Sequence, residues 1–169
     1  IRDLLKFEFF FPPKEPFLSL LGAELDVLAP EWRTVVPSAE WARTTLSEHA
    51  GVLMARRTLQ PFFDAQLVVA ERLVALGEDV AEREPFLQAC LGYGHQLALQ
   101  GRVKARDSVS TELYSAAFEL AGNRDLVEAG SEDLLADRRA FLSEVEEMRS
   151  RLAHLAAIEQ EAHQQETET

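Results

Sequence analysis

The fold is decided by residues 61–77, Pro-Phe-Phe-Asp-Ala-Gln-Leu-Val-Val-Ala-Glu-Arg-Leu-Val-Ala-Leu-Gly. Apolar side chains recur there at intervals of three and four residues, the period of one face of an α-helix. Gly77 ends the pattern and suits the position just after a helix. The chain shows no sustained period-two alternation of β-branched residues, so we predict an all-α fold. The predicted apolar face consists of Phe62, Phe63, Leu67, Ala70, Leu73 and Val74.

Helical signals extend on both sides of this stretch. We expect an irregular bundle of about six helices ending in a long C-terminal helix, with Pro61 breaking or kinking the chain and Pro85 at the first position of its helix. Ser38, then Asp107 or Ser108, and Ser131 after Gly130 are expected as N-caps. Predicted buried sides consist of Phe86, Cys90, Tyr93, Gly94 and Leu97, and of Val109, Leu113, Ala116, Ala117 and Leu120. The expected helices are 14–29, 39–57, 62–77, 85–100, 109–122 and 132–160.

The last of these helices has a partial heptad seam, which Arg138 interrupts. Such a seam is typical of one face of a bundle, and a coiled-coil dimer arm is the alternative. After Glu159 the apolar residues give way to Gln, Glu and Thr, so residues 159–169 are expected to form a frayed or disordered tail. The seam consists of Leu134, Phe141, Val145, Met148, Leu152 and Leu155.

The first residues form an aromatic block, although chain termini are normally polar. Aromatic side chains need a surface to cover them, so residues 1–13 are interpreted as a docking segment that continues from an upstream domain. Packing into the domain's own core and dipping into a bilayer interface are the alternatives. Residues 14–158 are expected to form the helical domain. The candidates for an interdomain or membrane interface are Phe7, Phe9, Phe10, Phe11 and Phe17.

Composition excludes several classes of function. The formal net charge of −12 argues against a nucleic-acid partner and against simple attachment to anionic lipid. Cys90 is the single cysteine, so no internal disulfide can form. The longest uncharged stretch, residues 85–101, is too polar for a membrane span, and no transmembrane helix is predicted.

Motifs that carry chemistry are scarce. Cys90 lies on an apolar helix face, where a buried hydrophobe is the simpler interpretation than a nucleophile. His95 is interpreted as a surface or partly buried histidine, not as a catalytic base. No Glu stands three residues before any histidine, which disfavours a ferritin-like metal centre, and no phosphate loop or nucleophile elbow occurs. We therefore predict no catalytic, cofactor-binding or metal-binding residue in this chain.

Several segments nevertheless resemble one family, the large bacterial glycerol-3-phosphate 1-O-acyltransferases, above all their actinobacterial members, in the C-terminal region. The similarity runs from the first residue to about residue 155. The segments are Leu4-Leu-Lys-Phe-Glu-Phe-Phe-Phe11, Phe86-Leu-Gln-Ala-Cys90, Leu99-Gln-Gly-Arg-Val103, Ser108-Val-Ser-Thr-Glu-Leu-Tyr114, Leu120-Ala-Gly-Asn-Arg-Asp-Leu126 and Asp137-Arg-Arg-Ala-Phe141.

The resemblance implies an enzyme that transfers an acyl group from acyl-CoA or acyl carrier protein to glycerol 3-phosphate. It also implies phospholipid synthesis and a peripheral location at the cytoplasmic face of the cell membrane. The family's His-x4-Asp motif is absent here, because the residues five positions after the histidines are Met54, Gln100, Glu159 and Glu168. The resemblance therefore implies a non-catalytic helical portion that supports an upstream domain, which would bind the substrates. The alternatives are a ligand-binding and dimerisation domain of a one-component transcription regulator, or a stand-alone helical adaptor.

Overall fold

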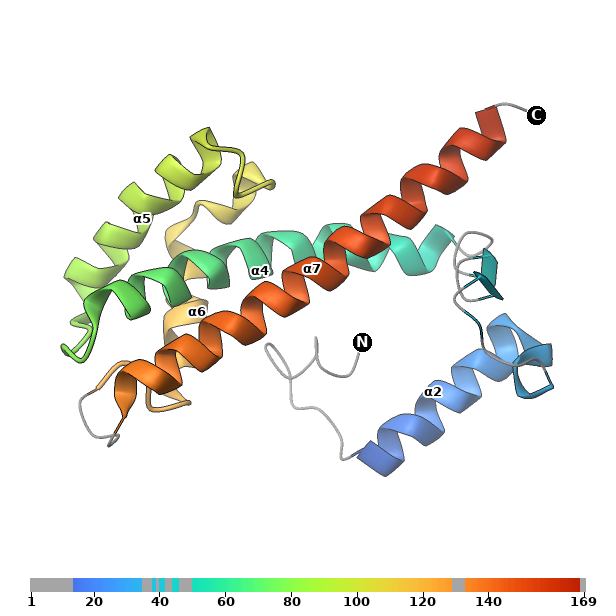
Figure 1. Cartoon of the computed structure of the whole chain (residues 1–169), viewed down its shortest axis with the longest axis horizontal. Coiled ribbons are helices and arrows are strands. Elements are labelled where there is room, and N and C mark those ends of the chain that lie inside the picture. Colours follow the sequence, from blue (N-terminus) through green and yellow to red (C-terminus); the bar gives the residue numbers. More distant parts are fainter. Residues whose placement is uncertain are drawn as a thin grey trace. The chain divides into compact units, whose positions relative to one another are not determined.

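The structure, a computed structural model, describes residues 14–34, 38, 40–41, 44–45, 50–128 and 133–167. Over these residues every regular element is a helix, which confirms the all-α prediction, and none of the helices is long and apolar enough to span a membrane. The chain ends in the expected long helix (Figure 1). The elements are α2 (Lys14–Leu28), η1 (Pro30–Arg33), α4 (Ala50–Leu76), α5 (Arg83–Leu99), η2 (Arg106–Ser108), α6 (Thr111–Gly122) and α7 (Leu134–Thr167).

The chain divides into two compact units. One unit comprises Arg57–Leu152 and contains α5, α6 and most of α4 and α7. The other comprises Ile1–Arg56 and Ala153–Thr169, and α2 and η1 belong to it. Helices α4 and α7 therefore each contribute residues to both units.

Helix α4 provides the centre of the Arg57–Leu152 unit. All eight residues from 63 to 70 are buried, including the polar Asp64 and Gln66. The sequence predicted a helix with one apolar face, whereas this segment is enclosed on every side. Pro61 lies inside α4, so the predicted break is wrong. Proline removes one backbone hydrogen bond of a helix, but the burial of the eight residues that follow favours a continuous helix.

Helix α7 runs antiparallel to α4 within this unit, because Arg149 contacts Asp64 while Arg138 contacts the backbone of Gly77. The predicted seam is buried at Leu134, Phe141, Val145, Met148 and Leu152. Helix α7 reaches Thr167, seven residues beyond the predicted end near Gln160.

Arg138 belongs to the same buried face, and its exposed fraction is 0%. Its guanidinium donates to the carbonyl oxygens of Leu126 at 2.8 Å, Gly77 at 2.7 Å and Asp79 at 3.0 Å, and more weakly to that of Leu73 at 3.4 Å. These carbonyls lie at the end of α4, in the turn after it and after α6. Burial lowers the pKa of Arg138, although an arginine stays protonated. The residue that interrupts the apolar seam is therefore the cation that joins three parts of the unit.

Helices α5 and α6 pack on one another. The rings of Phe86 and Phe118 lie 5.5 Å apart between centroids. Tyr114 is fully buried, and its hydroxyl lies against Gly94, where an added Cβ would come within 1.9 Å of the oxygen. This hydroxyl has no hydrogen-bond partner among the described residues, and burial raises the pKa of Tyr114 to about 12. Only Gly allows α5 to approach the ring this closely.

The buried side of α6 differs from the prediction. It consists of Tyr114, Ala117, Phe118 and Ala121, whereas Ala116 is exposed and Val109, Leu113 and Leu120 are only partly buried. Small and aromatic residues pack on α5 here, and a rule based on aliphatic spacing missed both rings. On α5 the prediction is confirmed for Phe86, Cys90, Gly94 and Leu97, while Tyr93 is partly exposed.

Helix boundaries follow local capping chemistry. Ser38 is confirmed as a cap, because its hydroxyl accepts from the Trp41 amide at 3.0 Å. The predicted cap at Asp107 or Ser108 is wrong, because these residues belong to η2 and Ser110 accepts from Leu113 N instead. The expectation for Gly130 and Ser131 lies outside the described residues, and Asp133 accepts from Ala136 N at the start of α7. Helix α5 begins at Arg83, two residues before Pro85.

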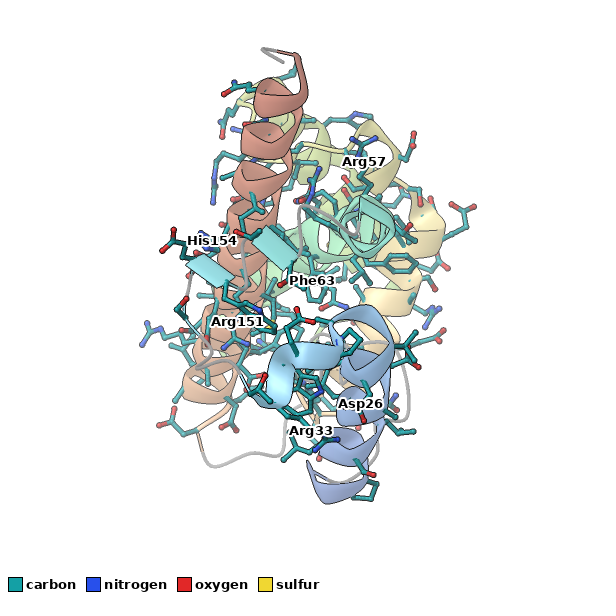
Figure 2. All side chains as sticks on the ribbon, turned by 90° about the vertical axis from the view of Figure 1, so that its right-hand side faces the viewer. Asp26, Arg33, Arg57, Phe63, Arg151 and His154 are labelled. Atoms are coloured by element: carbon teal, nitrogen blue, oxygen red, sulfur yellow. The ribbon has the colours of Figure 1, made fainter. Side chains whose placement is uncertain are left out.

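The Ile1–Arg56 and Ala153–Thr169 unit contains a local cluster between α2 and η1. The Asp26 carboxylate accepts from Trp32 Nε1 at 2.8 Å and from Arg33 Nε and Nη2, both at 2.9 Å. Asp26 and Arg33 lie together in Figure 2. These hydrogen bonds lower the pKa of Asp26. The cluster is exposed, so it fixes a turn and contributes little to stability.

Replacing Arg138 with Met should lower the free energy of unfolding by about 3 kcal/mol, because buried carbonyl acceptors lose their donor. Replacing both partners of a buried ion pair with apolar groups can leave stability unchanged. The partners of Arg138 are backbone carbonyls, which remain buried after any side-chain substitution. Urea unfolding measures the effect. Arg139→Met is the matched control, because Arg139 is the exposed neighbour on α7. Equal losses in the two variants would contradict the capping role of Arg138.

Two glycines of α5 should respond in opposite directions to alanine. Gly94→Ala should destabilise the unit by about 1–3 kcal/mol, because the new Cβ collides with the Tyr114 hydroxyl. Gly92→Ala should stabilise it by about 1 kcal/mol, because nothing lies within 4 Å and alanine favours helix. Adding Tyr114→Phe should recover part of the Gly94→Ala loss in thermal unfolding. No recovery would show that the collision is not with the hydroxyl.

Candidate functional site

The structure contains a groove of about 700 Å³ at the C-terminal end of α5. Most of its lining is apolar, and all of it belongs to the Arg57–Leu152 unit. Concave apolar surfaces with few polar groups are the usual form of binding sites. The lining residues are His95, Ala98, Leu99, Gly101, Val103, Lys104 and Val109.

A sharp turn at the end of α5 shapes one side of the groove. Gly101 has a φ of 71°, and the Arg102 amide donates to the Leu97 carbonyl at 2.9 Å. This is the arrangement in which a residue with positive φ ends a helix, and glycine adopts it without strain. The turn starts the loop that continues through Val103 and Lys104.

Asp64 of α4 binds the backbone of this loop. The Asp64 carboxylate accepts from the backbone amides of Lys104 at 2.9 Å and Ala105 at 3.1 Å. Gln60 donates to its other oxygen at 2.9 Å. The exposed fraction of Asp64 is 0%, so these donors replace water entirely. A carboxylate on the central helix thereby fixes the backbone of the groove wall.

Arg149 of α7 neutralises this buried carboxylate. Its Nε lies 3.0 Å and its Nη2 2.9 Å from Asp64 Oδ1, and it also donates to the Arg102 carbonyl. One guanidinium thus binds both the central helix and the loop. Breaking such a buried pair costs about 3–5 kcal/mol, whereas an exposed pair contributes at most about 1 kcal/mol. The Asp64–Arg149 pair is therefore the interaction that orders the wall.

A second polar cluster, formed by Glu71, Tyr93 and Arg102, also anchors the loop. Tyr93 donates to Glu71 Oε2 at 2.7 Å, and Arg102 pairs with the same carboxylate. Burial and the hydrogen bond to Glu71 raise the pKa of Tyr93, and the same carboxylate raises the pKa of Arg102. Neither cluster could be predicted from local sequence, because Tyr93 lies 22 residues from Glu71 and Arg149 lies 85 residues from Asp64.

The groove itself is apolar with a basic rim. Leu99 is 91% exposed, the highest value among the large exposed hydrophobics of the described residues. His95 and Lys104 are exposed beside it, and neither forms an ion pair with the described residues. Among the described residues, no carboxylate belongs to the lining. This arrangement can bind an apolar group next to a negative charge, but it presents no nucleophile next to a base.

Of the other residues weighed in the sequence, His95 lines the groove, whereas Cys90 is not among its lining residues. Cys90 is fully buried, and burial raises the pKa of its thiol to about 12, which opposes a nucleophilic role. His95 is on the helix surface as predicted, and His154 is exposed on α7. Across the described segments, no three His, Cys, Asp or Glu side chains are placed to hold a metal ion. Phe7, Phe9, Phe10 and Phe11, and the side chain of Phe17, lie outside the described residues.

Residues 1–130 match the family described as glycerol-3-phosphate acyltransferase C-terminal region. The chain belongs to this family. It is also 36% identical over 159 residues to proteins of Mycobacterium bovis and Mycobacterium tuberculosis that are named acyltransferase plsB1. These matches cover 94% of the chain but only 26% of each relative. No solved structure matches the chain significantly.

Family membership confirms the resemblance that the sequence segments indicated. The helical chain belongs to the family of glycerol-3-phosphate acyltransferase C-terminal regions, and nothing in these similarities supports a transcription regulator or a stand-alone adaptor. All the lining residues named for the groove lie within the matched residues. Helix α7, with Arg138 and Arg149, follows the residues that match the family.

Replacing Asp64 with Asn should destabilise the Arg57–Leu152 unit by about 3–5 kcal/mol, because Arg149 loses its counter-charge in the interior. The amides of Lys104 and Ala105 should also exchange hydrogen faster than in the parent chain, because their acceptor is weakened. Urea unfolding and hydrogen exchange with mass spectrometry measure the two effects. Asp107→Asn is the control, because Asp107 is exposed in the same loop. Unchanged exchange at residues 104–105 would contradict the anchoring role.

Proposed function

We propose that this chain is a non-catalytic helical portion of a glycerol-3-phosphate 1-O-acyltransferase that supports the catalytic domain of the same protein. In this proposal the whole enzyme transfers an acyl group from acyl-CoA or acyl carrier protein to glycerol 3-phosphate, in phospholipid synthesis. Membership of the family over residues 1–130 is the observation that carries the proposal. The chain spans only 26% of the relatives' length, which leaves ample sequence in those proteins for a catalytic domain.

The chemistry of the described residues supports a structural role. The charged groups of the interior, Asp64, Arg138 and Arg149, are all engaged in holding helices and loops together. The single thiol is buried and its pKa is high. A general base must lie within hydrogen-bond reach of a reacting group, and His95 faces a groove that offers it no such partner.

Contact with the catalytic domain is proposed to involve the aromatic residues of the docking segment. Five of the ten phenylalanines of the chain lie in the first seventeen residues, and such a density of rings favours a covered surface. The residues concerned are Phe7, Phe9, Phe10, Phe11 and Phe17.

The location proposed for the whole enzyme is peripheral, at the cytoplasmic face of the cell membrane. The family's lipid-forming reaction is the argument for this location. The net charge of −12 makes the helical portion a poor electrostatic anchor by itself, so contact with lipid is assigned to the full-length protein.

The proposal is tested by assaying acyl transfer to glycerol 3-phosphate. The isolated chain should show no turnover above background, and the full-length protein should be active. Changing Phe7, Phe9, Phe10 and Phe11 to Ser in the full-length protein should reduce activity and thermal stability together, because a covering contact is lost. Turnover by the isolated chain would overturn the non-catalytic role. Full activity and stability of the quadruple variant would overturn the docking role of the aromatic segment.

A further inference from the structure

Helix α2 has two apolar faces, of which one packs against η1. Gly22 is buried on this face, and atoms of Trp32 and Arg33 lie 3.7 Å from the position of a Cβ added there. Leu21 and Leu25, on the same side of the helix as Gly22, are partly buried. This side of α2 is therefore covered by its own unit.

The second apolar face of α2 is exposed. Its residues follow one another at spacings of four, three and four, which places them along one side of a helix. Leu20 is 61% and Val27 78% exposed. A helix that is apolar on both sides is normally covered on both sides, so this face is suited to a partner. We call it the α2 stripe, and it consists of Pro16, Leu20, Ala23 and Val27.

Charge argues against lipid as the partner of the α2 stripe. Amphipathic helices that lie on membranes carry Lys and Arg beside their apolar face. Here the exposed residues beside the stripe are acidic, Glu24 on one side and Asp26 on the other. Asp26 is bound to Arg33 of η1, and Lys14, at the first position, is the one basic residue in the sequence of α2.

The size of the α2 stripe favours a partner in the same polypeptide. Helix α2 has 15 residues and is therefore about 22 Å long. One face of such a helix is far smaller than the roughly 800 Å² that each partner contributes to a stable complex of separate chains. A partner in the same polypeptide has a high effective concentration, so a smaller contact suffices.

The position of α2 in the chain identifies which part of the polypeptide this is. The helix begins at Lys14, directly after the docking segment of residues 1–13, to which the proposed function assigns contact with the catalytic domain. Two consecutive segments that contact one neighbour add their areas. The chain spans only 26% of the relatives' length, so those proteins contain the additional sequence that such a partner requires.

We propose that the α2 stripe is a contact surface for an apolar patch of the catalytic domain of the same polypeptide. The inference rests on the proposed function, which assigns the catalytic domain to sequence outside residues 1–169. It extends the contact of the aromatic segment onto a helix whose exposed side chains the structure describes. Val27 is the anchor of this surface, because it is the more exposed of the two large side chains in the stripe.

The test uses the full-length protein with p-benzoylphenylalanine in place of Val27. After irradiation, the crosslinked product should migrate as a monomer, and mass spectrometry should identify a peptide from outside residues 1–169 joined to α2. Leu18 is the matched control position, because it is apolar and 51% exposed on the same helix but lies on the side opposite Leu20. The same photoreactive residue at position 18 should not give this product.

A charge placed on the stripe gives a second measurement. Val27→Arg should lower the yield of the crosslink from position 20 by about tenfold, since a covered arginine would lack a partner, whereas Leu18→Arg should preserve the yield. Val27→Arg should leave thermal unfolding of the isolated chain unchanged, because the side chain is exposed there.

A crosslink from position 27 to a second copy, to lipid, to residues 1–169 or to nothing would overturn the proposal. Equal yields from positions 18 and 27, equal effects of the two arginine variants, or a lower unfolding temperature of the isolated Val27→Arg chain would do the same. Acyl transfer by the isolated chain would overturn the proposed function. An inactive isolated chain together with a missing crosslink would overturn only the contact at the α2 stripe.

Discussion

The Arg57–Leu152 unit depends on one constraint, which is that the buried carboxylate of the central helix and the carbonyls at the end of that helix need partners inside the protein. Helix α4 is buried along residues 63–70, and it carries Asp64 there and free carbonyls at its end. Unpaired buried groups would cost more free energy than a small domain has to spare. Two arginines of α7 provide the partners: Arg149 pairs with Asp64, and Arg138 donates to the carbonyls. Helix α7 therefore contacts α4 through a charged side chain at each of two positions, Arg138 and Arg149, and buries apolar residues between these positions.

This arrangement links the core of the unit to its surface. The carboxylate that pairs with Arg149 also accepts from the backbone of residues 104 and 105, so the same interaction that joins two helices orders the loop at the end of α5. The groove beside that loop is consequently part of a rigid body.

Much of the helical architecture could be predicted from local sequence. Gly77 follows its helix with positive φ as expected, and Ser38 caps its helix. The predictions failed where contacts between residues distant in the sequence determine helix continuity or burial. Pro61 was expected to break or kink the chain, but it lies inside one helix without a break, and the buried side of α6 was assigned by aliphatic spacing although Tyr114 and Phe118 occupy it. Arg138 was treated as an interruption, yet its spacing of four residues from Leu134 and three from Phe141 placed it on the buried face.

The sequence by itself determined that this protein is helical, acidic and related to glycerol-3-phosphate acyltransferases, because periodicity, charge and the order of similar segments are local properties of the chain. Only the tertiary structure decided which polar residues are buried and what they hold. Asp64 and Arg149 are 85 residues apart, and Arg138 and Gly77 are 61 apart. No spacing rule connects positions so distant, because their meeting depends on how α7 packs against α4. The groove around Leu99 follows from the same packing, since its wall is held by groups from both helices.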